Sequence, residues 1–177
     1  MADRETMEEA FKQALGNRVF ECAVIPTSDI NFSVDVLKAC EANVCGKYNT
    51  CWTCPPVIGP MEQHKKKIRA FPWAFVFTTK GDLEDSFDYE GMIRAKDCHN
   101  RLSAEMHERF GKTNPVYGAG SCTLCESCAW PNPCRFPGKT IISVEAAGIN
   151  VTDLSRTGNI KYNNGANTVT YFSMILF

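Results

Sequence analysis

Eight of the ten cysteines in this 177-residue chain form two groups of four. The first group lies in the segment 40–56 and consists of Cys40, Cys45, Cys51 and Cys54; the second lies in the segment 118–138 and consists of Cys122, Cys125, Cys128 and Cys134. Sets of four thiolates bind zinc or iron–sulfur clusters. Both segments also contain glycine and proline, which are untypical of cores that bury free thiols. The pattern therefore predicts that all eight side chains bind metal.

The second group favours an iron–sulfur cluster. Its C-x2-C-x2-C run can wrap a loop around a cubane, so that consecutive thiolates reach three different irons. Cys134 follows six residues after Cys128, close to Pro137, and can complete the set. This last gap is longer than in bacterial ferredoxins, so the spacing predicts the cofactor type, [4Fe-4S], without implying ferredoxin homology.

Zinc remains the alternative for both groups. Structural zinc prefers C-x2-C pairs separated by longer stretches, and the first group contains one such pair, Cys51 and Cys54. The division of the eight cysteines between two clusters also stays open. In two-cluster ferredoxins the last cysteine of each run ligates the other cluster, and Cys54 or Cys134 could do the same here.

Four stretches together resemble a family of small predicted metal-binding proteins from anaerobic bacteria and archaea. They are "CEANVCGKYNTCWTCPP", "GSCTLCESCAWPNPCRFPGK", "SVEAAGINV" and "NNGANTVTYFSMILF", and the resemblance runs from about residue 18 to the C-terminus. Val144 stands where the family commonly has methionine, a change that affects packing more than chemistry. The resemblance implies metal binding through the two cysteine motifs, as iron–sulfur clusters, and no particular reaction.

Composition excludes several classes of protein. The net charge is −1, so the chain has no general attraction to phosphate backbones, and we expect no nucleic-acid partner. No apolar run approaches eighteen residues, and the charged N-terminal stretch lacks a signal-peptide pattern, so we expect no membrane partner. These features predict a cytoplasmic protein, and that reducing compartment argues against structural disulfides.

The remaining segments predict one domain over 1–177, of the α+β or α/β class. We expect a central mixed sheet with helices, from which the two cysteine loops emerge. Strands are expected at 18–25, 71–79 and 167–177, the last apolar on both faces like a central strand. Helices are expected at 6–15, at 33–40 after a Ser33 cap, from Pro60 onward, at 83–110 between Asp82 and Gly111, and near 143–156.

Several residues near the cysteines have two interpretations. Trp52 and Trp130 could shield a cluster from water or simply pack the loops. Arg135 could stabilise a reduced cluster or be a surface charge. His99 lies in the apolar stripe of the long helix, which favours a core residue over an extra ligand. The basic run 64–69, "HKKKIR", is a solvated helix face or a docking site for an acidic redox partner.

The function predicted from these features is electron transfer by a protein with two iron–sulfur clusters and a redox partner protein. The sequence contains no phosphate-binding glycine loop and no obvious catalytic set, so no catalytic residue is assigned. Three alternatives stay open: an enzyme or reductive activator with an open cluster site, a zinc-stabilised interaction module, and a cluster scaffold or carrier.

Overall fold

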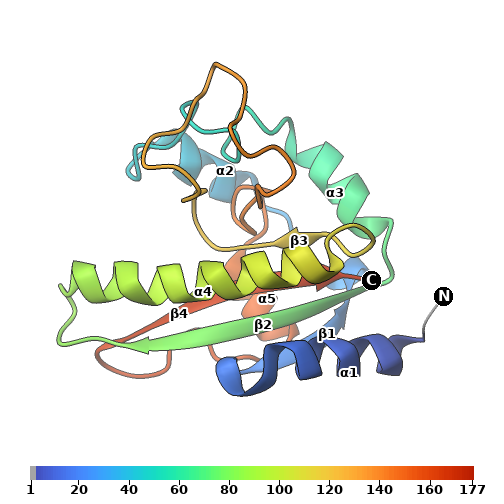
Figure 1. Cartoon of the computed structure of the whole chain (residues 1–177). Coiled ribbons are helices and arrows are strands. Elements are labelled where there is room, and N and C mark those ends of the chain that lie inside the picture. The colour runs from blue at the N-terminus through green and yellow to red at the C-terminus, as the bar shows by residue number, and fades with distance from the viewer. Residues whose placement is uncertain (1–2) are drawn as a thin grey trace.

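The centre of the molecule is a four-stranded sheet in the order β1-β2-β4-β3, seen in a computed structural model that describes residues 3–177 (Figure 1). The strands are β1 (Cys22–Pro26), β2 (Trp73–Asp82), β3 (Val116–Tyr117) and β4 (Thr168–Leu176). All three pairings are antiparallel, so the fold is α+β and the sheet is not the mixed one that we expected. An alternation of strands and helices along a sequence does not fix strand direction, which explains this difference.

The final strand lies inside the sheet, as its apolar sequence predicted. β4 pairs with β2 along nine residues and with β3 on its other edge. Its residues from Phe172 to Leu176 are buried on both faces. Such a strand needs helices or loops over both faces of the sheet.

One face is covered by two helices, α1 (Arg4–Leu15) and α4 (Tyr89–Phe110), which lie in front of the sheet in Figure 1. Their apolar side chains pack against alternate residues of the central strands. This cluster contains Phe11, Leu15, Phe75, Phe77, Leu102, Met106, Val116 and Ile175.

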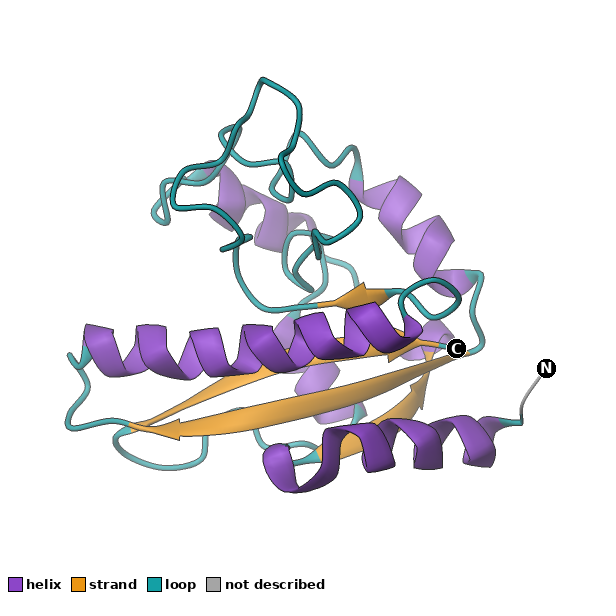
Figure 2. Ribbon diagram, in the orientation of Figure 1, coloured by secondary structure: helices purple, strands orange, loops and turns teal. Residues whose placement is uncertain are grey.

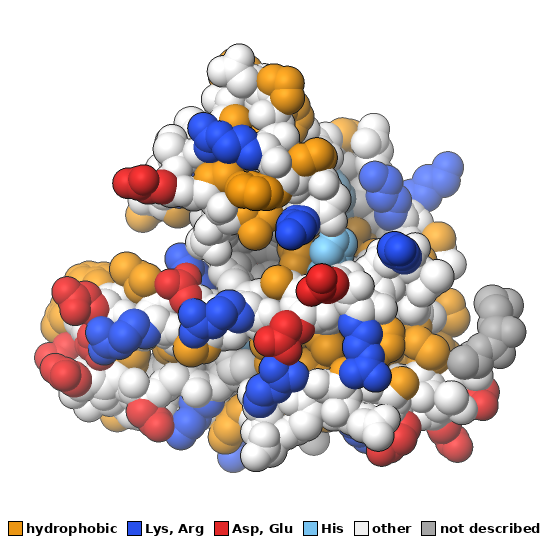
Figure 3. Space-filling view, in the orientation of Figure 1, with side chains coloured by type: hydrophobic (Ala, Val, Ile, Leu, Met, Phe, Trp, Pro, Cys, Tyr) orange, Lys and Arg blue, Asp and Glu red, His pale blue; other side chains and the backbone are white. Residues whose placement is uncertain are grey.

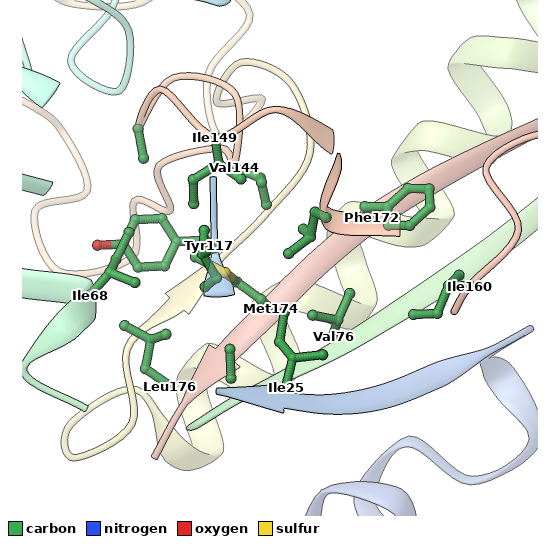
Figure 4. Packing of buried hydrophobic residues seen from close by; sticks show 14 residues of the cluster. Ile25, Ile68, Val76, Tyr117, Val144, Ile149, Ile160, Phe172, Met174 and Leu176 are labelled. Atoms are coloured by element: carbon green, nitrogen blue, oxygen red, sulfur yellow. The ribbon is translucent and has the colours of Figure 1, made fainter. Parts of the chain in front are cut away.

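The opposite face is covered by α5 (Val151–Thr157), by the turn 143–150 and by Ile68 from α3 (Met61–Arg69). Figure 4 shows this second cluster, in which Val76, Met174 and Leu176 project from the sheet toward Val144 and Ile149. The turn 143–150 is thus anchored in the core, although it belongs to no helix or strand.

The helix caps confirm some predicted boundaries and correct others. Ser33 caps α2 (Val34–Glu41) by accepting a hydrogen bond from the Asp35 N–H, and Gly111 ends α4. Asp82 is not the cap of α4: it pairs with Thr168 at the end of β2. The cap is Asp88, whose Oδ1 accepts from the Gly91 N–H at 2.7 Å.

Three further expectations needed adjustment. Pro60 directly precedes α3 instead of occupying its first position. The strand expected at 18–25 begins only at Cys22, because a short 3-10 turn occupies Gly16–Arg18. A second 3-10 turn, Thr27–Asp29, follows β1. The helix expected near 143–156 is limited to α5. Gly148 interrupts it, because its φ of +87° lies outside the helical region.

Candidate metal centre

The two cysteine segments lie against each other above the sheet and form one substructure, which we call the cysteine cap (residues 40–59 and 118–140). Figure 2 shows it as a group of loops with almost no regular structure. The Trp52 Nε1–H donates to the carbonyl of Asn132 at 2.9 Å, and the Trp52 and Trp130 rings meet edge to face at 4.6 Å. The two tryptophans therefore join the segments, which confirms a packing role for both.

Thr53 provides a second connection between the segments. Its hydroxyl accepts a hydrogen bond from the Cys122 N–H at 3.2 Å and lies 3.4 Å from the Cys51 sulfur. Thr53 and Cys51 are both almost fully buried, at 1% and 2% exposure. This contact holds the C-x2-C pair of the first segment against the start of the C-x2-C-x2-C run.

All four cysteines of the second group line one cavity. The lining cysteines are Cys122, Cys125, Cys128 and Cys134, and Cys51 from the first segment joins them. Each of the four is partly exposed, whereas Cys51 is buried. One cavity therefore presents five thiols, one more than a single cluster requires.

Backbone N–H groups point at the sulfurs of this cavity. Burial raises the pKa of Cys128, but hydrogen bonds from the backbone of Trp130 and Trp52 and from the Cys51 thiol outweigh it, so the net pKa is lowered. The Phe136 N–H donates to the Cys134 sulfur at 3.4 Å. Such N–H···S contacts stabilise negative charge on sulfur, which metal binding requires.

The first group is less compact. Cys54 is buried, and burial together with the neighbouring Cys51 raises its pKa to about 12. Burial and the neighbouring Cys45 thiol raise the pKa of Cys40. Cys51 lines the cavity of the second group, and its carbonyl accepts a hydrogen bond from the Cys54 N–H at 3.1 Å, so Cys51 lies at the junction of the two groups.

Sequence reasoning missed one acidic residue at the first group. Glu145, in the core-anchored turn 143–150, lies close enough to Cys40 to contribute to the raised pKa of that thiol. Its Oε2 atom is buried and has no hydrogen-bond partner. An acidic residue inside the otherwise apolar stretch "SVEAAGI" was the available signal.

A family model described as "Predicted metal-binding protein (DUF2284)" matches residues 23–177. The chain belongs to this family. The match includes every cysteine of both groups, so the metal binding in the family description agrees with the donor atoms that the cap presents. No curated protein and no solved structure matches the chain.

The thiol-rich cap fits the metal that the family description implies. Five thiols around one cavity, with N–H groups directed at two of them, form a soft donor set that suits zinc or iron–sulfur clusters. Within residues 3–177, no three Cys, His, Asp or Glu side chains stand in the tight arrangement that one metal ion needs. In a cubane each thiolate binds a different iron, so the sulfurs of its ligands stand further apart than around one ion.

Other residues of this family member take structural roles. His99 is fully buried, with Nδ1 2.9 Å from the Thr79 hydroxyl and Nε2 2.7 Å from the Ser173 hydroxyl. Both ring nitrogens are therefore occupied, which confirms a core residue. Cys22 is partly buried against the α1–α4 side of the sheet, and Cys98 is exposed on α4, where it accepts from the Arg101 side chain.

The basic run 64–69 is two-sided. His64 and Ile68 face inward and are buried, whereas Lys66, Lys67 and Arg69 are exposed. Arg135 lines the cavity of the second cysteine group, and its Nη1 donates a hydrogen bond to the Ser127 carbonyl. This contact stabilises the conformation of the C-x2-C-x2-C run. Among the described residues, no helix is long and apolar enough to cross a bilayer.

Proposed function

We propose that this protein binds two iron–sulfur clusters, of the [4Fe-4S] type, and transfers electrons between partner proteins. The observation that carries the proposal is the single cavity lined by Cys51, Cys122, Cys125, Cys128 and Cys134. A loop with cysteines at every third position can present successive thiolates to different corners of one cubane. When bound, such a cluster accepts and releases one electron at a time.

The surroundings of the cavity suit a cluster more than a closed zinc site. Structural zinc takes four ligands, usually from two C-x2-C pairs, and the second segment has three evenly spaced cysteines followed by a fourth. N–H groups directed at Cys128 and Cys134 would stabilise the extra negative charge of a reduced cluster. The carboxylates and histidines that hold catalytic zinc do not line this cavity.

The cap is also suited to exchange electrons with another protein. Figure 3 shows it as a protrusion above the sheet layer, with hydrophobic side chains beside lysine and arginine side chains. Leu124 and Phe136, which line the cavity of the second cysteine group, are 39% and 40% exposed, so the cavity wall reaches the surface. We propose an acidic redox protein as the partner, received by the exposed cations of α3 that follow the cap in sequence.

The test is metal analysis of protein purified without oxygen. We expect roughly eight irons and eight sulfides per chain, a brown colour, and a signal in electron paramagnetic resonance (EPR) after chemical reduction. Cys125→Ser should lose about half of the iron, since it removes one ligand of one cluster. The matched control, Cys98→Ser, changes an exposed cysteine outside both groups and should keep all of it. A colourless protein with two zinc ions and no sulfide would overturn the proposal.

A second candidate function is an enzyme or reductive activator with an open cluster position. The position of Cys51 favours it. If Cys51 belongs to the second centre, the first centre retains only Cys40, Cys45 and Cys54, and one iron lacks a thiolate. In that case Cys51→Ser would leave the iron content of the first centre unchanged, because Cys51 would not be one of its ligands. We also propose a reducing, cytoplasmic location, because oxidation to disulfides would remove the ligands.

A further inference from the structure

A cavity of about 400 Å³ lies where the second segment of the cysteine cap meets α4. It is formed by α4 and by residues 118–124 and 139–141, and we call it the neck cavity. Figure 1 shows the cap above this helix. Cys122 and Leu124 line both the neck cavity and the cavity of the second cysteine group. A molecule bound in the neck cavity would therefore lie beside a proposed cluster ligand.

Hydrogen bonds hold the walls of the neck cavity in place. The Gly118 N–H donates to the Ile142 carbonyl and the Val144 N–H donates to the Gly118 carbonyl, each at 2.9 Å. These bonds join the two ends of the second segment. The His107 Nε2 on α4 lies 2.9 Å from the Gly138 carbonyl, which attaches the same segment to the helix. The neck cavity is therefore preformed, as sites for small molecules usually are.

The buried end of the neck cavity is closed by Ser103, which is 1% exposed. Its hydroxyl donates to the His99 carbonyl at 3.1 Å and lies 2.8 Å from the Ser173 hydroxyl. This hydroxyl is thus satisfied within the protein. Groups that bind a ligand must come from the outer part of the lining.

The outer lining presents polar side chains that the protein itself does not use. They are Asn100, Ser121, Thr123 and Lys139, all partly or fully exposed. The side-chain hydrogen bonds found next to the cavity, within residues 3–177, are made by other groups. The ion pairs found among the same residues do not include Lys139. No carboxylate of the described chain lines the cavity, so Lys139 gives it a net positive charge.

A larger groove of about 1120 Å³ on another face of α4 differs in this respect. Its cations are already paired, since Arg18 bonds to Glu105 and Lys80 bonds to Asp82. A ligand in that groove would have to displace these ion pairs. The donors of the neck cavity are available without such a displacement, which makes it the better candidate for a binding site.

We propose that the neck cavity is a binding site for a small organic monocarboxylate. The Lys139 ammonium group pairs with the carboxylate, and the Asn100 amide and the Ser121 hydroxyl donate to its oxygens. The apolar part of the ligand packs against Ala104 and Ile141. One cation and a partly apolar lining suit a single carboxylate, whereas a phosphate dianion takes more charged donors. This inference goes beyond the proposed function and stands whether the cap holds iron–sulfur clusters or zinc.

The test is isothermal titration calorimetry on protein purified without oxygen, with its metal in place. The probes are the sodium salts of butyrate, acetate and phosphate. Butyrate should bind saturably and roughly tenfold more tightly than acetate, because two more methylene groups leave water. Phosphate should bind more weakly than butyrate.

Substitutions around the cavity identify the site. Lys139→Met should weaken butyrate binding by roughly tenfold or more, because it removes a charge-assisted hydrogen bond. Lys139→Arg keeps the charge and should retain most of the affinity. The matched control, Lys112→Met, changes an exposed lysine outside the cavity and should bind butyrate like the wild-type protein. Leu124→Ala should reduce the preference for butyrate over acetate, because it removes apolar lining.

Absence of saturable butyrate binding to the wild-type protein would overturn the inference. Equal affinities of Lys139→Met and Lys112→Met would do the same, and so would tighter binding of phosphate than of butyrate. The proposed function is judged separately, by the iron and sulfide content. A zinc protein that binds butyrate would overturn the proposed function alone, and an iron–sulfur protein that does not bind it would overturn this inference alone.

Discussion

In the sheet layer, Phe75 and Phe77 of β2 are fully buried beneath α1 and α4, whereas between residues 120 and 140 of the cysteine cap no residue is fully buried. The buried residues of the first cap segment are Cys51, Thr53, Cys54 and Pro55, of which only Pro55 is an ordinary apolar residue. The sheet layer therefore has a hydrophobic core of its own, and the cap does not.

This difference indicates how each region obtains its order. Apolar burial stabilises the sheet layer with or without a cofactor. The cap has only the Trp52–Trp130 contact, a few hydrogen bonds and its cysteines. Under the proposed function, metal–thiolate bonds would supply most of its rigidity. Removal of metal should therefore loosen the cap and leave the sheet folded.

The largest expected effect comes from a cavity in the sheet layer. Phe75→Ala removes a fully buried ring from β2 and should lower the free energy of unfolding by about 3–5 kcal/mol. Urea denaturation of the metal-free protein, followed by circular dichroism, measures this loss. The matched control is Phe87→Ala, which changes a phenylalanine that is 76% exposed and should shift stability by about 0.5 kcal/mol or less. Equal losses would contradict the assignment of the core.

The sheet layer was also the region that the sequence predicted best. A strand apolar on both faces has one solution, a central position, and β4 takes it between β2 and β3. Helix ends were predictable where one residue decides them, as at Ser33 and Gly111. The start of α4 was not: Asp82 and Asp88 are equally good caps locally, and the pairing of Asp82 with Thr168, distant in sequence, decides between them.

For the cap, the sequence predicted metal binding but not how the eight cysteines divide between the two centres. Eight cysteines in two spacings indicated metal, and the family match agrees with that prediction. The position of Cys51 beside the second group depends on the path of an irregular loop, which no sequence periodicity predicts. It follows from a contact distant in sequence, the hydrogen bond from the Cys122 N–H to the Thr53 hydroxyl. The nearness of Glu145 to Cys40 could not be predicted from the sequence, because it results from the packing of α2 on the turn 143–150.

A smaller effect, again confined to the sheet layer, should appear on acidification. Burial lowers the pKa of His99 to about 4, so the unfolded chain binds a proton that the folded chain does not bind between pH 6.5 and 4. The contribution of His99 is complete above about pH 6.5 and is lost as the pH falls toward 4, by on the order of 3 kcal/mol in all. Urea denaturation of the metal-free protein over this pH range measures the loss.

A control for this pH dependence is His99→Gln, in which most of the slope should disappear. Burial also lowers the pKa of His64, so a residual slope of the same sign should remain. An unchanged slope in His99→Gln would show that other groups cause the acid sensitivity.

The smallest effect tests the cap. The edge-to-face contact of Trp52 and Trp130 should contribute about 1 kcal/mol beyond simple burial, because the edge of one ring meets the face of the other. Trp130→Leu in the metal-loaded protein should therefore speed iron loss to a chelator by roughly fivefold. Trp52→Leu and the double variant Trp52→Leu/Trp130→Leu complete a double-mutant cycle. The second substitution should add less than the first, since both remove the same contact.

The matched control from the sheet layer is Trp73→Leu, on β2. It should lower the free energy of unfolding without changing the rate at which the chelator removes iron. If Trp73→Leu speeds iron loss as much as Trp130→Leu does, the cap and the sheet layer open as one unit. The inference that the two regions are stabilised independently would then be wrong.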